Sequence, residues 1–432
     1  MKIAFLIHNA YGIGGTIRTT GNLAAALAAW HDVEIASVFR HRESPRFAVD
    51  SSVRLTPLVD TRPGARRPGE RRAGNGRATQ DRASLLFPAG DGRFRQYSRA
   101  TDRRIAAWLA GTDADVVVGT RPGLNVMLAH HGPRHAVRIA QEHLTLDGHR
   151  RALRGRLLGC YPLLDAVVTV TEADAAAHRR HLGGVRVEAI PNSVPRPARH
   201  AHDESSRLVV AAGRFEPGKR FDLLVDAFAE VARERPDWRL HLYGDGPCLG
   251  SVRDRVERNG LRHNVRLMGT HPAMDEVWAA GAIAVVSSDA ESFGMTLVEA
   301  MRSGLPVVST DCPLGPREII HEGEDGLLVP VGDRHALAEA LLCLINDNER
   351  RARMAHTARE AARRFDPGAI ARRHEALFEE LLHRRRSAAT NAPTRTREAR
   401  AVITYAVTES AFRAARHVVR RVHDIRAAPG AS

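Results

Sequence analysis

The sequence predicts an α/β protein built from two doubly wound, Rossmann-like domains that face each other across a cleft. Three observations favour this fold class. The 432 residues exceed what one ordinary core holds, so two domains are expected. Apolar strands alternate with helical patterns along the chain, as they do in parallel βαβ units. A polar stretch with three prolines, IPNSVPRPARHAHDESS, separates the two halves.

In the first half we expect a domain over residues 1–192, followed by a linker over 193–206. Its expected strands are KIAFLI, VEIASVF, ADVVVG, VRIAQE and AVVTV, with LAAALAAW as a helix after the first strand. An Arg-rich segment with many Pro and Gly, at about 62–82, is predicted to be a loop or an insertion.

In the second half we expect a domain over residues 207–366. Its pattern is strand RLVVAAG, helix FDLLVDAFAEVARERP, strand WRLHLYG, helix SVRDRVERNG, strand NVRLMG, helix MDEVWAAG and strand AIAVVSS. A long helical stretch, ALAEALLCLINDNERRARMAHTAREAARRF, follows and is predicted to form two pieces. A helix over 367–383 is expected to cross back to the first domain, and 384–432 forms a basic tail.

Composition narrows the class of protein. The five apolar residues before His8 predict a buried strand rather than a signal peptide. No apolar run reaches the roughly 20 residues of a membrane span. The four cysteines lack metal-like or redox spacing, so a reduced, cytoplasmic protein is expected.

The formal net charge of +14 is unevenly distributed. The tail over 384–432 has eleven arginines and three acids, a surplus of +8. Its segment AVITYAVTESAFRAARHVVRRVHDIR is compatible with a basic amphipathic helix that docks on an anionic membrane, at the inner face of the membrane. The alternatives are a helix packed on the first domain and a disordered extension. Nucleic acid is not an expected partner, because aromatic residues are few and no binding motif accompanies the charge.

Three loops at strand ends could hold a ligand. The first, NAYGIGGTIRTT, follows the first strand, and its Gly12, Gly14 and Gly15 could let a phosphate or a second substrate approach the backbone closely. A dinucleotide fingerprint would need a glycine where Ile17 stands. A tight turn that needs glycine is the alternative interpretation.

The second loop, GRFEPGKR, places Gly213, Gly218 and Lys219 in the G-x-x-x-x-G-K pattern of a phosphate loop. Arg220 stands where such a loop needs Ser or Thr for magnesium. Lys219 is one of only two lysines in the chain, which marks it as an exception to a strong arginine bias. Arg214 and Lys219 are therefore candidate phosphate contacts, and a solvated charged loop is the alternative.

The third loop lies in ESFGMTLVEAMRSGLPVVST, which begins at Glu291. A helix is predicted from Met295 to Ser303, ended by Gly304. Backbone N–H groups at its start form an anion site. Glu299 lies about 6 Å along the helix, which matches the step from a diphosphate to the ribose of the same nucleotide. Glu291 precedes the helix, where a donated group would lie.

These residues resemble retaining GT-B glycosyltransferases of the family-4 type. The segment from Glu291 to Glu299 matches the E-x7-E motif of that family, and the likeness continues through EGEDGLLVPVGD. GRFEPGK resembles the G-R-x-x-x-x-K segment of the family, LYGDGP its glycine turn, and IPNSV the end of its first domain. The resemblance covers about residues 1–383 and is more specific in the second half.

The resemblance implies roles for single residues. Arg214 and Lys219 would neutralise the leaving diphosphate, Glu299 would hold the ribose, and Glu291 would bind donor-sugar hydroxyls. His143, in QEHLTLDGH, stands where the family often has a histidine near the donor sugar, and a histidine that caps a strand end is the alternative. The catalytic residues implied are Glu291, His143, Arg214 and Lys219. The donor-binding residues implied are Gly14, Gly15, Arg214, Lys219, Glu291, Phe293, Gly294, Met295, Thr296 and Glu299.

The resulting expectation is a cytoplasmic, retaining enzyme that transfers a hexose-type sugar from a UDP-sugar to an unidentified cell-envelope, lipid-linked or secondary-metabolite acceptor. A metal is not expected. Asp113 and Asp115 form a D-x-D pattern, but they lie at the amino end of a strand, opposite to the end where ligands bind, and are interpreted as loop residues. HRRH from His178 to His181 is interpreted as a solvated helix face rather than a metal site. Two other classes stay open. One is a P-loop-like NTPase that uses Gly213 to Lys219, with Asp245 as a loose metal candidate. The other is a non-catalytic nucleotide-binding or membrane-adapter protein.

Overall fold

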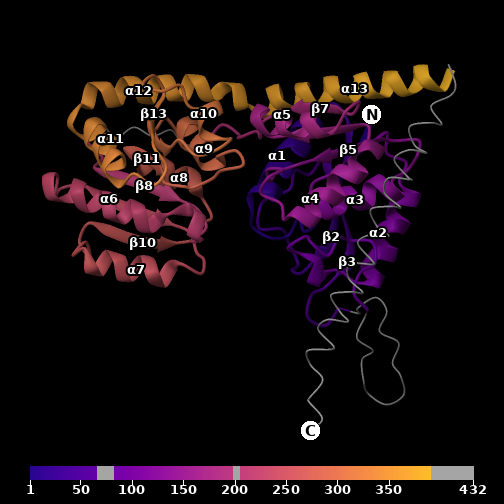
Figure 1. Cartoon of the computed structure of the whole chain (residues 1–432), viewed down its shortest axis with the longest axis horizontal. Helices are drawn as coiled ribbons and strands as arrows, with labels where there is room; N and C mark the ends of the chain where they lie inside the picture. The colour runs from indigo at the N-terminus through magenta and orange to yellow at the C-terminus, as the bar shows by residue number, and fades with distance from the viewer. Residues whose placement is uncertain (66–81, 198–204, 391–432) are drawn as a thin grey trace, which may run out of the picture. The chain divides into compact units, whose positions relative to one another are not determined.

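The computed structural model describes residues 1–65, 82–197 and 205–390. The chain divides into two compact units (Figure 1). Unit 1 comprises Met1–Thr169, Ala175–Glu188 and the chain from His374, and unit 2 comprises Val170–Asp174 and Ala189–Arg373. Most of the predicted Arg-rich insertion, the middle of the predicted linker, and the predicted amphipathic helix of the basic tail lie outside the described residues.

Unit 1 contains a seven-stranded sheet in the order β3-β2-β1-β4-β5-β6-β7. The pairs from β3 through β6 are parallel. The five strands predicted in this half are confirmed, while β3 and β7, at the two edges, were not predicted. The strands are β1 (Lys2–Ile7), β2 (Asp32–Arg40), β3 (Val53–Asp60), β4 (Val116–Gly119), β5 (Val137–Gln141), β6 (Ala166–Thr169) and β7 (Arg186–Ala189).

The helices of unit 1 begin with α1, which starts earlier than predicted. It spans Gly15–Leu27 instead of starting at Leu23, because the polar turn TIRTTGN is helical too. Helix α2 begins with a capping box, in which the Ser98 side chain accepts from Thr101 N and the Thr101 side chain accepts from Ser98 N. The helices are α1, α2 (Arg99–Gly111), α3 (Pro122–His131), α4 (Arg151–Cys160) and α5 (Glu172–His181), with short 3-10 helices η1 (Phe94–Gln96) and η2 (Tyr161–Leu163).

Unit 2 contains a six-stranded parallel sheet in the order β10-β9-β8-β11-β12-β13. Its strands are β8 (Leu208–Ala212), β9 (Arg239–Tyr243), β10 (Val265–Gly269), β11 (Ile283–Val286), β12 (Val307–Thr310) and β13 (Gly326–Val329). Its helices are α6 (Phe221–Glu234), α7 (Leu249–Arg258), α8 (Met274–Ala280), α9 (Met295–Ser303), α10 (Pro316–Ile319), α11 (Arg334–Asn346) and α12 (Asn348–Ala361), with η3 (Pro217–Lys219) and η4 (Ala362–Phe365). The last helix, α13 (Pro367–Thr390), contributes residues to both units.

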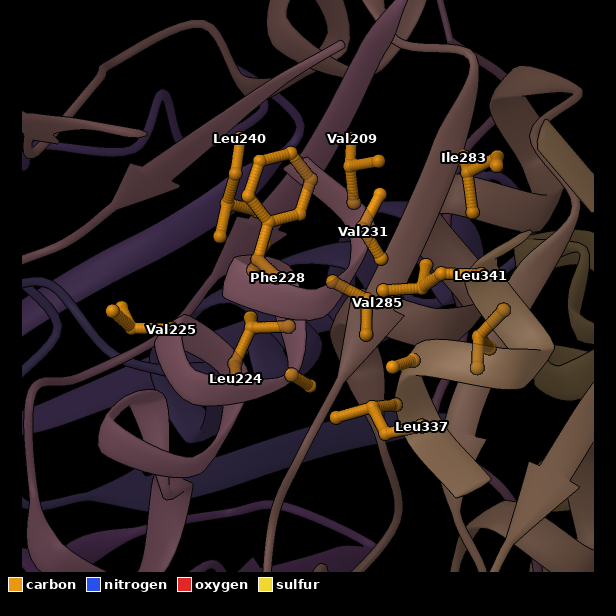
Figure 2. Close-up of a cluster of buried hydrophobic side chains, with 14 of the residues drawn as sticks. Val209, Leu224, Val225, Phe228, Val231, Leu240, Ile283, Val285, Leu337 and Leu341 are labelled. Carbon is orange, nitrogen blue, oxygen red and sulfur yellow. The ribbon is translucent and has the colours of Figure 1, made fainter. Parts of the chain in front are cut away.

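Both faces of the unit 2 sheet are covered, which is the defining feature of a doubly wound domain. Val209 and Ile283 belong to a cluster with α6, α7 and α11 (Figure 2). Their strand neighbours Val210 and Ala284 belong to a second cluster with α8, α9 and α12. Successive strand residues point to opposite faces, so burial on both faces produces the unbroken apolar runs seen in the sequence.

Two helix predictions for unit 2 are confirmed at their boundaries. Helix α9 spans Met295–Ser303 and ends at Gly304, which has a φ of 88°. The long predicted helical stretch is divided between α11 and α12 at Asp347, whose side chain accepts a hydrogen bond from Arg350 N at the start of α12. Among the described residues, none of the helices has the length and apolar character that crossing a membrane requires.

Candidate active site

The candidate site of unit 2 lies where the strand order reverses. Strands β8 and β11 are neighbours in the sheet, although β9 and β10 come between them in the chain. In open α/β sheets, ligands bind outside the carboxyl ends of the strands at such a switch point. The loop after β8 carries Lys219 and the loop after β11 carries Glu291, so two predicted site residues start from adjacent strand ends.

The loop after β8 is held at several points. Its start is anchored by Gly213 N, which donates to Tyr243 O at 3.0 Å, and by Phe215 N, which donates to Asp245 O at 3.0 Å. The loop approaches the following glycine turn very closely, because a Cβ on Gly244 would lie 1.8 Å from Gly213 O. This explains the glycine turn that the sequence shows.

The end of the same loop is joined to the loop after β11. Arg220 has a φ of 49°, a left-handed conformation that is strained for a residue with a side chain. Ser287 Oγ donates to Lys219 O at 2.8 Å, and Asp289 N donates to Gly218 O at 2.8 Å. These bonds fix the backbone on which Lys219 lies relative to the backbone that leads to Glu291.

The side chains of Lys219 and Glu291 are paired directly. Lys219 Nζ lies 2.5 Å from Glu291 Oε1, and Ser288 Oγ donates to the same oxygen at 2.7 Å. The sequence assigned these residues to different parts of a donor, and it did not indicate this contact. Arg214 does not join the pair. Its side chain is 66% exposed, and its Nε lies 3.0 Å from Glu216 Oε1.

Helix α9 presents its N-terminus at the end of the Glu291 loop. Gly294 is its N-cap residue with a φ of 113°, and among the described residues no side chain caps this end. The first backbone N–H groups, which include those of Met295 and Thr296, have no acceptor within the helix, so they favour an anion. Glu299 lies in the second turn of the helix and is 8% exposed.

Three residues that the sequence did not single out contact this loop, namely Leu314, Gly315 and Phe365. Gly315 packs against it so closely that a Cβ on Gly315 would lie 1.8 Å from Phe293 O. Leu314 forms an isolated parallel bridge with Glu291 and has a φ of 86°. The ring of Phe293 is buried and lies edge-on to Phe365 at 5.6 Å. The only sequence signal for these contacts is the Gly-Pro pair of CPLGP, which indicates a turn but not its neighbour.

In unit 1, the two predicted glycines lie at the carboxyl end of β1. Helix α1 begins at Gly15, and Gly14 is its N-cap residue in extended conformation. A Cβ on Gly15 would meet no atom of the described chain within 4 Å, and one on Gly14 would meet only Ile17 Cδ1, at 4.0 Å. The fold therefore does not require glycine at these positions, which argues against the tight-turn interpretation and leaves room for a ligand.

His143 lies in unit 1, two residues after the end of β5. Both of its ring nitrogens are buried, and neither has a hydrogen-bond partner among the described residues. Burial lowers the pKa of His143 to about 4, although the Glu142 carboxylate acts in the opposite direction. A pKa this low corresponds to a neutral imidazole at physiological pH.

Two other sequence interpretations are settled by the structure. Asp113 and Asp115 precede β4 at its amino end, and Asp115 accepts from Lys2 N at 2.7 Å, as expected for loop residues. The solvated helix face predicted for HRRH is wrong for His178, which is 0% exposed and stacks on Tyr161 at 6.3 Å. The following Arg179 lies on the exposed side of α5. Within the described residues, no cluster of His, Cys, Asp and Glu could hold a metal ion.

Comparisons with solved structures define the class of fold. A mutant of Staphylococcus aureus TarM, solved with fondaparinux, alpha-GlcNAc-glycerol and UDP, superposes with a TM-score of 0.72 at 16% identity, over 88% of this chain and 100% of that chain. Sucrose-phosphate synthase from Thermosynechococcus elongatus gives 0.69 at 19% identity, over 88% and 99%. The chain has the two-domain GT-B fold of these proteins, which confirms the predicted fold class.

Sequence comparisons match part of the chain to a family. Residues 196–361 match the model of the family described as glycosyl transferases group 1. An exopolysaccharide phosphotransferase of Streptomyces coelicolor is 34% identical over 396 residues, which are 89% of this chain and 41% of that protein. A phosphatidyl-myo-inositol mannosyltransferase of Mycobacterium leprae is 29% identical over 307 residues, 66% of this chain and 78% of that protein. The chain thus spans less than half of the S. coelicolor relative.

Proposed function

We propose that this protein is a retaining glycosyltransferase that transfers a hexose-type sugar from UDP to a glycan-type acceptor. The observation that carries the proposal is the Lys219–Glu291 pair, which lies at the switch point of the unit 2 sheet together with the N-terminus of α9. A cation and an uncapped helix N-terminus suit a diphosphate, while the two carboxylates Glu291 and Glu299 suit sugar hydroxyls. The group 1 family match supports sugar transfer as the reaction class.

In the proposed reaction, the bond between the anomeric carbon and the β-phosphate oxygen breaks while the acceptor oxygen bonds to the same face of that carbon. The acceptor proton goes to the leaving phosphate, so no side-chain nucleophile takes part. Lys219 and the α9 N-terminus stabilise the charge that develops on the diphosphate, which is the main source of rate. Arg214 would join them by exchanging Glu216 for the phosphate.

The remaining site residues bind the donor. Glu299 accepts hydrogen bonds from the ribose hydroxyls, and Glu291 accepts them from the sugar. His143 and the Gly14–Gly15 backbone, which belong to unit 1, are further candidate substrate contacts. The choice of UDP is supported by structural neighbours that were solved with UDP, among them the S. aureus TarM mutant. A metal has no part in the proposed chemistry, because Lys219 and the helix supply the positive charge.

The experiment is a thermal unfolding measurement with UDP, GDP, ADP and ATP, each with magnesium and with EDTA. A ligand at a hundred times its Kd stabilises a protein by about 2.7 kcal/mol, which is readily measured. We expect stabilisation by UDP that survives EDTA and is lost in Lys219→Ala and Glu299→Ala. Lys2→Ala, which changes the only other lysine of the chain, is the matched control.

The same measurement tests the P-loop alternative. Stabilisation by ATP with magnesium alone, unchanged in Glu299→Ala, would replace the proposal with an NTPase. Stabilisation by UDP without any release of UDP from a panel of UDP-sugars would instead indicate a nucleotide-binding protein that does not catalyse transfer.

A further inference from the structure

Arg220, the residue that follows Lys219, departs from three local rules of protein structure. Its φ of 49° lies in the left-handed region, which disfavours residues that have a side chain. It is the N-cap residue of α6, yet a guanidinium has no acceptor with which to cap a helix. Its positive charge also lies at the positive end of the helix dipole. Such departures are expected at functional sites, where the side chain serves another purpose.

The Arg220 guanidinium joins the loop after β8 to the loop after β11. Its Nη1 donates to Asp289 Oδ1 at 3.0 Å, and Asp289 lies two residues before Glu291. Lys219 pairs with Glu291, so consecutive residues of the first loop reach two acids of the second loop. Both pairs lie within unit 2.

The stability of the fold does not account for the Arg220–Asp289 pair. The Arg220 side chain is 31% exposed and that of Asp289 is 43% exposed. Ion pairs between exposed side chains contribute little to stability, and the left-handed backbone at Arg220 reduces it. The position that the pair gives to the neighbouring Lys219 is therefore the better explanation.

We infer that Arg220 and Asp289 are positioning residues that keep the two loops joined while Lys219 binds the diphosphate of the donor. The inference rests on the proposed function, in which Lys219 makes that contact. Without a ligand, the Lys219–Glu291 pair itself links the loops. This link weakens once Lys219 shares its charge between Glu291 and a diphosphate. The Arg220–Asp289 bond then keeps the ammonium in place, and it acts only through Lys219.

The test is isothermal titration of UDP into the full-length wild type, Asp289→Ala, Arg220→Gly and the double variant, with EDTA and at one ionic strength. Asp289→Ala removes a negative charge, and by electrostatics alone this would tighten the binding of an anion. Loss of the positioning bond has the opposite effect on affinity. We therefore expect Asp289→Ala to raise the Kd for UDP about fivefold.

Arg220→Gly separates the positioning role from a role in folding. Glycine adopts the left-handed region freely, so this variant keeps the backbone conformation and loses the guanidinium. We expect its Kd for UDP to rise about fivefold or more, while its Tm stays within about 2 °C of the wild type. In the Arg220→Gly background, Asp289→Ala should change the Kd by less than about twofold, because its partner is already absent.

Asp222→Ala is the matched control. Asp222 Oδ1 lies 3.3 Å from Nε of the same guanidinium, and its side chain is 48% exposed. The two residues are neighbours at the start of α6, so their contact stays within one segment of the chain. Asp222→Ala removes the same charge as Asp289→Ala, and its Kd for UDP should equal that of the wild type or be lower.

The outcomes separate this inference from the proposed function. Binding of UDP by Asp289→Ala that is as tight as in the wild type, or tighter, would overturn the positioning role and leave the transferase intact. Equal losses from Asp289→Ala with and without the Arg220 guanidinium would overturn it too, because the two residues would then act separately. Parallel losses of Tm and affinity in Arg220→Gly would reduce its role to folding. If the wild type binds no UDP, the proposed function fails, and the inference fails with it.

Discussion

Replacing Glu291 with Gln should tighten the binding of free UDP while it slows sugar transfer. In the structure, Glu291 Oε1 lies 2.5 Å from Lys219 Nζ and accepts from Ser288 Oγ at 2.7 Å. Gln offers an acceptor oxygen to both donors, so the loop keeps its hydrogen bonds. The substitution therefore removes one negative charge from the expected diphosphate site with little change in shape.

The size of the effect follows from the distances. A phosphate oxygen that contacts Lys219 Nζ at about 2.8 Å would lie about 5 Å from the Glu291 carboxylate. Two unit charges at that distance repel by about 0.8 kcal/mol in water and about 3 kcal/mol at an effective dielectric constant of 20. The Lys219 side chain is 29% exposed and that of Glu291 is 11% exposed, so an intermediate value applies. We expect about 1 kcal/mol, or roughly a fivefold lower Kd for UDP.

The assay is isothermal titration of UDP into wild type and Glu291→Gln, with EDTA and at one fixed ionic strength. Asp222→Asn is the control, because it removes the same charge from a residue that pairs with Arg220 at 3.3 Å instead of with Lys219. Weaker UDP binding in Glu291→Gln would refute the reasoning, since Glu291 would then help to bind the diphosphate. Equal tightening in Asp222→Asn would refute it as well, because a long-range effect of net charge would explain both.

Three further predictions concern single positions. Gly315→Ala should destabilise the fold by about 1–3 kcal/mol in a urea titration, because its Cβ would lie 1.8 Å from Phe293 O, whereas Gly15→Ala should stay within about 0.5 kcal/mol. Equal stability of the two variants would contradict the close approach at Gly315. The pKa of His143, lowered to about 4, means that the unfolded chain binds the proton more tightly. The free energy of unfolding should therefore fall as the pH decreases from about 6.5 to about 4. The accompanying decline in Tm should be shallower in His143→Gln than in the wild type. Equal declines in the two proteins would contradict this prediction. Lys219→Arg should weaken UDP binding about tenfold in the same titration, and unchanged affinity would mean that any cation suffices there.

The central strands and helices of both units could be predicted because they are buried on both sides. Such strands appear as continuous apolar runs, as VVAA does in β8. The edge strand β3 escaped prediction for the opposite reason. Its sequence VRLTPLVD contains Pro57 and alternates irregularly, since an edge strand needs neither a full ladder of hydrogen bonds nor burial on both faces.

The candidate site could be predicted only in part. Helix α9 was located correctly because Gly304 and Pro306 mark its end in the sequence. The pairing of Lys219 with Glu291 could not be predicted, because it depends on the adjacency of β8 and β11, which the alternation of elements does not specify. The same holds for Gly315, whose need for glycine comes from the Phe293 carbonyl of another loop.

The pair also explains why a chain that uses arginine almost throughout has lysine at this position. A guanidinium is a planar fork that engages both oxygens of a carboxylate at once, so an arginine here would be held by Glu291. An ammonium is a compact charge with three donors that can be divided among acceptors. Lys219 can therefore keep one hydrogen bond to Glu291 and direct the others to a diphosphate. The exchange of partners that the proposed reaction needs is thus easier for lysine than for the residue that the composition favours.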